Sequence, residues 1–198
     1  MLVWMSATPT AVAHRLLAPE RSLLGHSAIC ETLQRFGIGA LHYAFERGIR
    51  VAPLRRSERY AQASPALQRL GIDVDSWPAP PAGLFVVEER TVYLRSRSPM
   101  TVAHEFGHAL DCALGAGIYR SGIDPRIRRC FSNARAFVTP YAATGIDEYF
   151  AESLRAFIEA NDPASAWPRA TRSRLAHLDP AMFAYVCELF DTEFRSVA

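Results

Sequence analysis

The chain has 198 residues, enough for one compact domain or for one domain with a small additional lobe. Hydrophobic residues make up 49% and charged residues 21%, a composition that excludes a disordered protein. The net charge of +2 argues against a protein that binds nucleic acid through its phosphates. No stretch reaches the roughly 18 apolar residues of a membrane helix. We therefore expect a folded protein with neither nucleic acid nor membrane as partner.

All 22 basic residues are arginine, and this bias has two explanations. It reflects either a GC-rich genome or a protein delivered into a foreign cytosol, where lacking lysine hinders ubiquitination. The N-terminus lacks the positive start of a signal peptide, and Pro9 interrupts its short apolar stretch. The sequence thus predicts a cytoplasmic protein, or one exported without a cleaved signal peptide.

The cysteine pattern argues against two common kinds of structural site. The four cysteines are widely spread and form no CxxC pair, which makes a cysteine zinc site and a disulfide framework improbable in a chain of this length. We expect buried free thiols. The cysteines are Cys30, Cys112, Cys130 and Cys187.

The N-terminal part carries mainly helical signals. Residues 22–36 place apolar side chains near a period of 3.6 and predict a helix. Residues 40–47 fit a strand or a short helix equally well. Residues 55–70 fit a helix with one polar side.

A proline-rich segment, residues 77–83, must be a loop or linker and marks the predicted domain boundary. We expect a helical N-terminal lobe over residues 1–80, with a role in binding substrate or a partner, and a catalytic domain over 81–198. Just after the boundary, two β-rich runs at 84–87 and 91–95 flank a polar turn and predict a hairpin.

A helix is predicted from Ser98 to about Leu114, with Ser98 as N-cap and Pro99 in the first turn. At its centre lies HEFGH, in which His104 and His108 stand four residues apart. Their imidazoles share one helix face and can bind one zinc ion at about 2.0–2.1 Å. Glu105 is turned about 100° away, so it can act as general base toward a water that the metal acidifies. The alternative is two ordinary histidines on a helix face.

Three other residues bear on this motif. Gly107 costs about 1 kcal/mol inside a helix, which close approach of another backbone or helix beside the metal would explain. Asp111 faces the same side as His108 and suits a hydrogen bond to an imidazole, unless it is a solvated residue near the helix end. His177 is a rival third ligand, although its polar setting also fits a surface histidine.

Glu148 is the preferred third ligand, on a helix predicted to begin near residues 144–147 and to run to Ala160. Glu148 and Glu152 stand four apart among bulky apolar neighbours, and two carboxylates on a half-buried face need a positive partner. Zinc is one such partner. A solvated acidic face, or an ion pair of Glu152 with Arg155, is the alternative. A last helix is predicted to start at Asp179 with its following proline.

The segments HEFGHALD and YAATGIDEYFAESLRAF resemble the catalytic domain of anthrax lethal factor and the bacterial Pro-Pro endopeptidases. Those proteins are gluzincin-type zinc peptidases, with HExxH on one helix and a tyrosine seven residues before a glutamate ligand on the next. Here Tyr141 stands seven residues before Glu148, within the matching E-[FY]-F-A-E pattern. The resemblance covers roughly residues 84–195 and does not extend to the region before them.

The resemblance implies a role for each matching residue. Glu105 would be base and proton shuttle, and Tyr141 would stabilise the oxyanion of the tetrahedral intermediate. The alternative for Tyr141 is a buried tyrosine with a satisfied hydroxyl. Glu152 would lie behind the ligands and hold a histidine. The ligands of the single implied zinc ion are His104, His108 and Glu148.

Taken together, these signals predict an α+β fold: a mainly helical, zincin-like domain with a small sheet or hairpin beside the active-site helix. The predicted function is a zinc-dependent endopeptidase. Its partner would be a polypeptide substrate that pairs with 91–95 as an edge strand, unless that hairpin is purely structural. The alternatives are a metal-binding regulatory or sensor protein without peptidase activity, and a translocated effector that cleaves one host protein.

Overall fold

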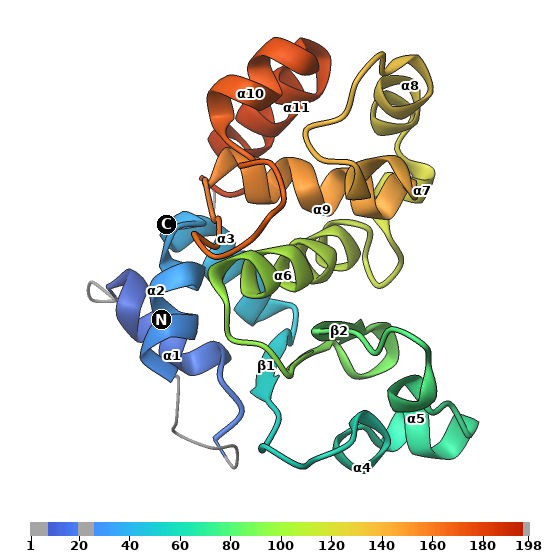
Figure 1. Ribbon diagram of the computed structural model, residues 1–198. Coiled ribbons are helices and arrows are strands. Elements are labelled where there is room, and N and C mark those ends of the chain that lie inside the picture. Colours follow the sequence, from blue (N-terminus) through green and yellow to red (C-terminus); the bar gives the residue numbers. More distant parts are fainter. Residues whose placement is uncertain (1–7, 20–25, 196–198) are drawn as a thin grey trace.

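The computed structural model describes residues 8–19 and 26–195. Two helices, α6 (Pro99–Leu114) and α9 (Ile146–Phe157), lie side by side across the middle of the molecule (Figure 1). The other α-helices are α1 (Pro9–Leu16), α2 (His26–Gln34), α3 (Gly37–Glu46), α4 (Tyr60–Ala63), α5 (Pro65–Leu70), α7 (Arg120–Ile123), α8 (Pro125–Asn133), α10 (Arg172–Leu178) and α11 (Pro180–Asp191). Short 3-10 turns are η1 (Val74–Ser76), η2 (Val87–Glu89) and η3 (Tyr141–Ala143). Within the described ranges, none of the helices combines the length and apolar character of a membrane span.

Helix α6 begins and ends where the sequence predicts. The Ser98 hydroxyl accepts a hydrogen bond from the Thr101 backbone N–H at 3.2 Å, and Pro99 occupies the first turn, where its missing N–H costs nothing. The helix ends at Gly115, whose N–H bonds the Asp111 carbonyl at 3.1 Å. Local capping therefore fixes the helix that carries HEFGH.

Gly107 lets α6 and α9 approach closely. A Cβ atom at position 107 would lie 3.0 Å from the Ala151 Cα and 3.2 Å from the Ala151 carbonyl oxygen, both backbone atoms of α9. This contact confirms the expectation that a neighbouring backbone explains the helical glycine. Because His104 and His108 lie on α6 and Glu148 lies on α9, the spacing of the two helices also sets the spacing of these side chains.

We expect Gly107→Val to lower the free energy of unfolding by about 1–3 kcal/mol, since overpacking forces the two helices apart. Urea denaturation measures this loss. Gly122→Val is the matched control, because a Cβ at position 122 meets no atom within 4 Å. An equal loss in both variants would contradict the packing argument.

The sheet has three strands, β1 (Arg50–Pro53), β2 (Gly83–Val86) and β3 (Thr91–Leu94), in the order β1-β3-β2. Strands β2 and β3 form the predicted antiparallel hairpin, and β1 pairs with β3 in parallel. The prediction that 91–95 is an edge strand is therefore wrong, because the hydrogen-bonding groups of β3 are used on both sides. Strand β2, with its free side toward α6, is the edge beside HEFGH.

The sheet lies between two packed layers. Val92 and Leu94 of β3 face the main core with Phe106 of α6, whereas Tyr93 faces a smaller cluster built by α4 and α5. This alternation is the period of two expected for a strand buried on both faces. The main core also contains residues of α1, α2 and α3, so the predicted N-terminal lobe packs directly against α6.

Other N-terminal predictions need adjustment. The undecided segment 40–47 is helical to residue 46, as part of α3. The predicted helix 22–36 is seen as α2 over residues 26–34, with residues 22–25 outside the described ranges. The predicted single helix 55–70 is wrong. Two short helices replace it, since Ser64 caps α5 by accepting from the Leu67 N–H at 3.2 Å. All four cysteines are free; two are buried and two are half-buried.

Candidate metal centre

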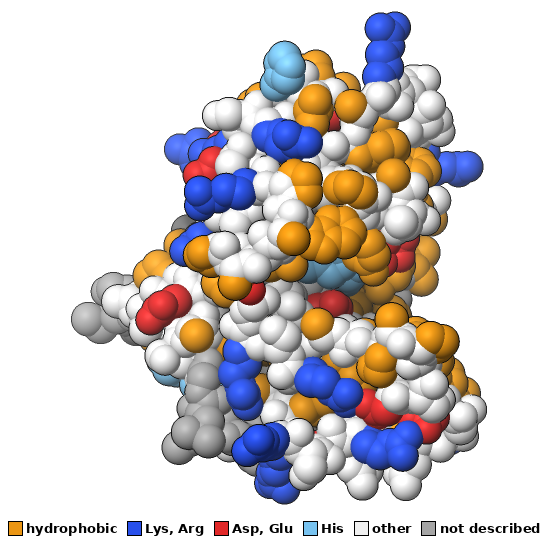
Figure 2. All heavy atoms as spheres, viewed as in Figure 1, with side chains coloured by type: hydrophobic (Ala, Val, Ile, Leu, Met, Phe, Trp, Pro, Cys, Tyr) orange, Lys and Arg blue, Asp and Glu red, His pale blue; other side chains and the backbone are white. Residues whose placement is uncertain are grey.

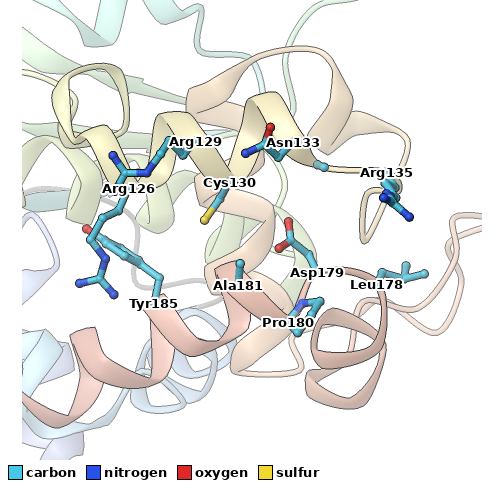
Figure 3. A pocket seen from close by; sticks show the side chains of 11 residues that line it. Arg126, Arg129, Cys130, Asn133, Arg135, Leu178, Asp179, Pro180, Ala181 and Tyr185 are labelled. Carbon is cyan, nitrogen blue, oxygen red and sulfur yellow. The ribbon is translucent and has the colours of Figure 1, made fainter.

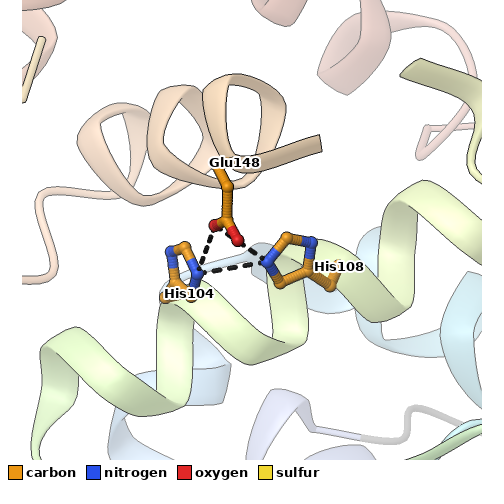
Figure 4. A group of neighbouring side chains, drawn as sticks. All are labelled: His104, His108 and Glu148. Atoms are coloured by element: carbon orange, nitrogen blue, oxygen red, sulfur yellow. Dashed lines mark hydrogen bonds and ion pairs between the residues drawn. The ribbon is translucent and has the colours of Figure 1, made fainter. Parts of the chain in front are cut away.

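Three potential ligand atoms from α6 and α9 converge on one point (Figure 4). The His104 Nε2 and His108 Nε2 atoms are 3.1 Å apart. The Glu148 Oε2 atom lies 3.0 Å from His104 Nε2 and 3.2 Å from His108 Nε2. The two imidazoles are nearly buried, and the Glu148 side chain is 21% exposed, so the group meets solvent on the carboxylate side.

Glu152 lies behind His104 and fixes its ring. The Glu152 Oε1 atom lies 3.0 Å from His104 Nδ1. The same carboxylate accepts the Thr139 hydroxyl at 2.5 Å and two nitrogens of Arg155, each at 2.7 Å. Surrounded by donors, the Glu152 carboxylate is the acceptor, so His104 Nδ1 donates to it and the other ring nitrogen, Nε2, is directed at Glu148. Glu152 therefore has both partners that the sequence suggested as alternatives, the imidazole and Arg155.

The electrostatics of the group favour positive charge between the carboxylates. Burial lowers the pKa of His104, but hydrogen bonds to Glu148 and Glu152 outweigh it and raise that pKa to about 10. Burial raises the pKa of Glu148, but the two imidazoles outweigh it and hold the pKa well below its ordinary value. Burial also raises the pKa of Glu152, but the hydrogen bonds from Arg155 and His104 outweigh it and lower that pKa to about 2. The two carboxylates thus favour a positive charge on His104.

In chelator-treated protein, these pKa shifts predict an optimum of stability between about pH 4.5 and 6.5. The raised pKa of His104 contributes stability that is complete below 6.5 and lost as pH rises through about 10. The lowered pKa of Glu152 contributes stability that is present above 4.5 and lost as pH falls through about 2. Thermal unfolding across pH measures both losses. The His177→Ala variant, which lacks an exposed histidine outside the group, should show the same pH dependence as the wild type. If the midpoint of the alkaline loss of stability does not fall between pH 6.5 and 10, the prediction is contradicted.

Glu105 lies beside the ligand group without joining it. The backbone of Phe85 in β2 lies near its carboxylate and favours the charged form. Gly83 of β2 makes room for it, because a Cβ there would lie 2.5 Å from the Glu105 Cγ. Burial raises the pKa of Glu105 above its usual value against the opposing pull of the two imidazoles. A raised pKa suits a group that must accept and return a proton near neutral pH.

Tyr141 contacts both Glu148 and His104 of the ligand group. Its hydroxyl donates to Glu148 Oε1 at 3.2 Å, and its ring centroid lies 5.3 Å from that of His104. The side chain is 41% exposed, unlike a tyrosine buried for packing. Partial burial and the Glu148 carboxylate raise the Tyr141 pKa well above its usual value, so the hydroxyl keeps its proton and can donate it in a hydrogen bond.

Asp111 and His177 do not join the group. Asp111 is fully buried and accepts from Ser121, at 2.8 Å from the backbone N–H and 2.5 Å from the hydroxyl. The remaining nitrogen of His108, Nδ1, is buried without a hydrogen-bond partner. The predicted bond from Asp111 to an imidazole is therefore not found. His177 lies exposed in the last turn of α10, whereas the ligand group joins only α6 and α9.

A cavity of about 280 Å³ opens beside His104 and Glu105. Figure 2 shows this face hollowed across the middle, with histidine and acidic atoms inside and hydrophobic side chains along the upper rim. The cavity walls are largely apolar and include Trp167, whose ring centroid is 6.2 Å from that of Tyr141. Sequence reasoning missed Trp167, because it lies in an irregular segment with no periodic signal.

A larger cavity, of about 500 Å³, lies between α8 and the beginning of α11 (Figure 3). Arg126, Arg129 and Cys130 line one side, and Asp179 and Tyr185 line the other. Its walls include none of the residues that the sequence predicts to act in chemistry. We therefore assign the site to the smaller cavity, where titratable side chains converge.

No family model matches the chain, and no curated protein matches it. Among solved structures, the chain is similar to the Pro-Pro endopeptidase PPEP-2 from Paenibacillus alvei, with 20% sequence identity and a TM-score of 0.64. The similarity covers 90% of this chain and 100% of that chain. At this identity the likeness establishes the fold alone, and it confirms the predicted α+β, zincin-like arrangement.

Proposed function

We propose that the protein is a zinc-dependent endopeptidase whose ion is held by His104, His108 and Glu148. One observation carries the proposal: the ligand atoms of these three side chains lie within 3.2 Å of one another. Three such atoms lie this close only when a proton or a metal ion is shared among them. The likeness in fold to an endopeptidase adds support.

The donor set suits zinc. Two imidazole nitrogens and one carboxylate oxygen are a known ligand set of catalytic zinc, with one position left for water or substrate. Ligand atoms at 2.0–2.1 Å from a tetrahedral ion stand about 3.3 Å apart, close to the distances found here. Glu152 behind His104 supplies the carboxylate partner that orients a zinc-binding imidazole. Zinc, when bound, would polarise the scissile carbonyl and lower the pKa of a water molecule.

The surrounding side chains supply the proton transfers and charge stabilisation of peptide hydrolysis. Glu105 accepts a proton from the attacking water and then gives it to the leaving amine. Tyr141 donates its hydroxyl hydrogen to the oxyanion that forms on the scissile carbonyl.

The substrate is a polypeptide bound in extended form along β2. The free side of β2 runs beside Glu105, so a chain added to this edge would present its backbone to the ligand group. The apolar cavity next to His104, with Met100, Tyr141 and Trp167 in its wall, can take one substrate side chain.

A peptide-library screen combined with metal analysis tests the proposal. Purified protein should contain one zinc ion per chain and cleave library peptides at a defined sequence, identified by mass spectrometry. Protein that binds zinc but cleaves no peptide would overturn the enzymatic assignment and support a sensor. Protein without affinity for zinc would overturn the metal site.

We expect Tyr141→Phe to lower kcat by about 10²–10³-fold, because an oxyanion donor is lost while all metal ligands remain. Steady-state kinetics on the selected peptide and zinc analysis measure the two effects. Tyr119→Phe is a matched control, since the Tyr119 ring also lies near a ligand imidazole, 5.7 Å from His108. Equal losses in the two variants would remove Tyr141 from the mechanism.

A further inference from the structure

Arg155 is a buried arginine that donates hydrogen bonds to Glu152, the carboxylate behind His104. It belongs to α9, and only 1% of the residue is exposed. The Nε and one terminal nitrogen each lie 2.7 Å from a different oxygen of Glu152. This two-bond geometry fixes the plane of a carboxylate, which a single donor cannot do.

The guanidinium is itself held from behind. Its other terminal nitrogen donates to the Ala160 carbonyl at 3.0 Å and to Asn161 Oδ1 at 3.3 Å. A continuous series of hydrogen bonds therefore runs from the end of α9 through Arg155 and Glu152 to His104 Nδ1. Removing either member of a buried ion pair leaves the other charge uncompensated, which is strongly destabilising.

We propose that Arg155 is a positioning residue that sets the orientation and metal affinity of His104 through Glu152. The inference rests on the proposed zinc site. With Arg155 present, Glu152 has one orientation, and the His104 ring can donate from Nδ1 in only one plane. Without it, the carboxylate turns toward other donors, and the ring loses the partner that keeps Nε2 directed at the metal position. Arg155 itself contributes no atom to the ligand group.

Zinc affinity of Arg155→Met, measured by competition with a chromophoric chelator, tests the inference. We expect a loss of about 10–100-fold, the range for removing an outer partner of a metal ligand. The visible spectrum of the cobalt(II)-substituted protein should change as well, because it reports the geometry of the ligands. Arg155→Lys, which keeps the charge but not the paired donors, should show a smaller loss.

Arg172→Met is the matched control. The Arg172 Nε donates to the Phe157 carbonyl at 2.7 Å, so it also ties down the end of α9, but it does not contact Glu152. If the role of Arg155 is purely structural, the Arg155 variants should bind zinc as tightly as Arg172→Met and show the same cobalt spectrum. That result would overturn the inference. If Arg155→Met does not fold, Arg155→Lys decides by the same comparison. A wild-type protein that binds no zinc would instead refute the proposed function.

Discussion

Glu105→Gln should lower kcat for peptide hydrolysis by about 10²–10⁴-fold, the contribution of a positioned general base. Glutamine keeps the shape of the side chain, but it cannot take up a proton near neutral pH. Because Glu105 is not among the converging ligand atoms, the variant should hold zinc as tightly as the wild type. Steady-state kinetics and metal analysis on the same preparation measure both results.

Glu46→Gln serves as its control, since Glu46 is an exposed residue at the end of α3, outside the cavity. Retained cleavage by Glu105→Gln would refute the proposed chemistry while leaving the metal site intact. Loss of zinc from the same variant would mean that Glu105 helps to bind the ion, which the geometry does not support. Kinetics and metal analysis of Glu105→Gln together therefore show whether Glu105 acts as a general base or as a metal ligand.

The ligand group could be predicted from the sequence because each half of it is a local pattern. His104 and His108 are one helical turn apart, and Ser98 with Pro99 fixes that helix in place. Glu148 was harder, since its helix lies far along the chain. Its spacing of four from Glu152 favoured it, and the resemblance with Tyr141 seven residues before it strengthened the choice. The close approach of α6 and α9 had one sequence signal, the glycine at position 107.

The sheet was predicted less well, because strand order depends on contacts between distant segments. The hairpin β2–β3 is local and was found from its β-rich runs. Strand β1 comes from four residues, 50–53, too few to show a period, and its parallel pairing with β3 is what makes β3 central. The error mattered for the functional hypothesis, because it took 91–95 as the free edge of the sheet, whereas the free edge beside α6 is β2.

The supporting residues show a further limit of sequence reasoning. Arg155 was considered only as an alternative to a metal role for Glu152, whereas the structure has Glu152 between Arg155 and His104. A single carboxylate has two oxygens with several acceptor positions, so the two roles do not compete. Thr139, which also donates to Glu152, lies before the η3 turn and has no pattern that marks it.

Glu148→Ala should weaken zinc binding by more than the roughly 10–100-fold that follows loss of an outer partner, because a direct ligand is removed. Two imidazoles on one helix remain, and two ligands bind an ion much less tightly than three. Glu148 also holds the Tyr141 hydroxyl, at 3.2 Å, so the proposed oxyanion donor loses its support and full activity should not return when zinc is added in excess. Chelator competition and kinetics at saturating zinc measure the two losses.

Asp147→Ala is the control beside it, since Asp147 is the neighbouring carboxylate in the first turn of α9 and contributes no atom to the ligand group. Full zinc affinity in Glu148→Ala would require another third ligand. His177 would have to leave an exposed position on α10, and Asp111 would have to give up both bonds to Ser121. Each change requires a large rearrangement, so the Glu148 variant is the most direct test of whether α9 completes the metal site.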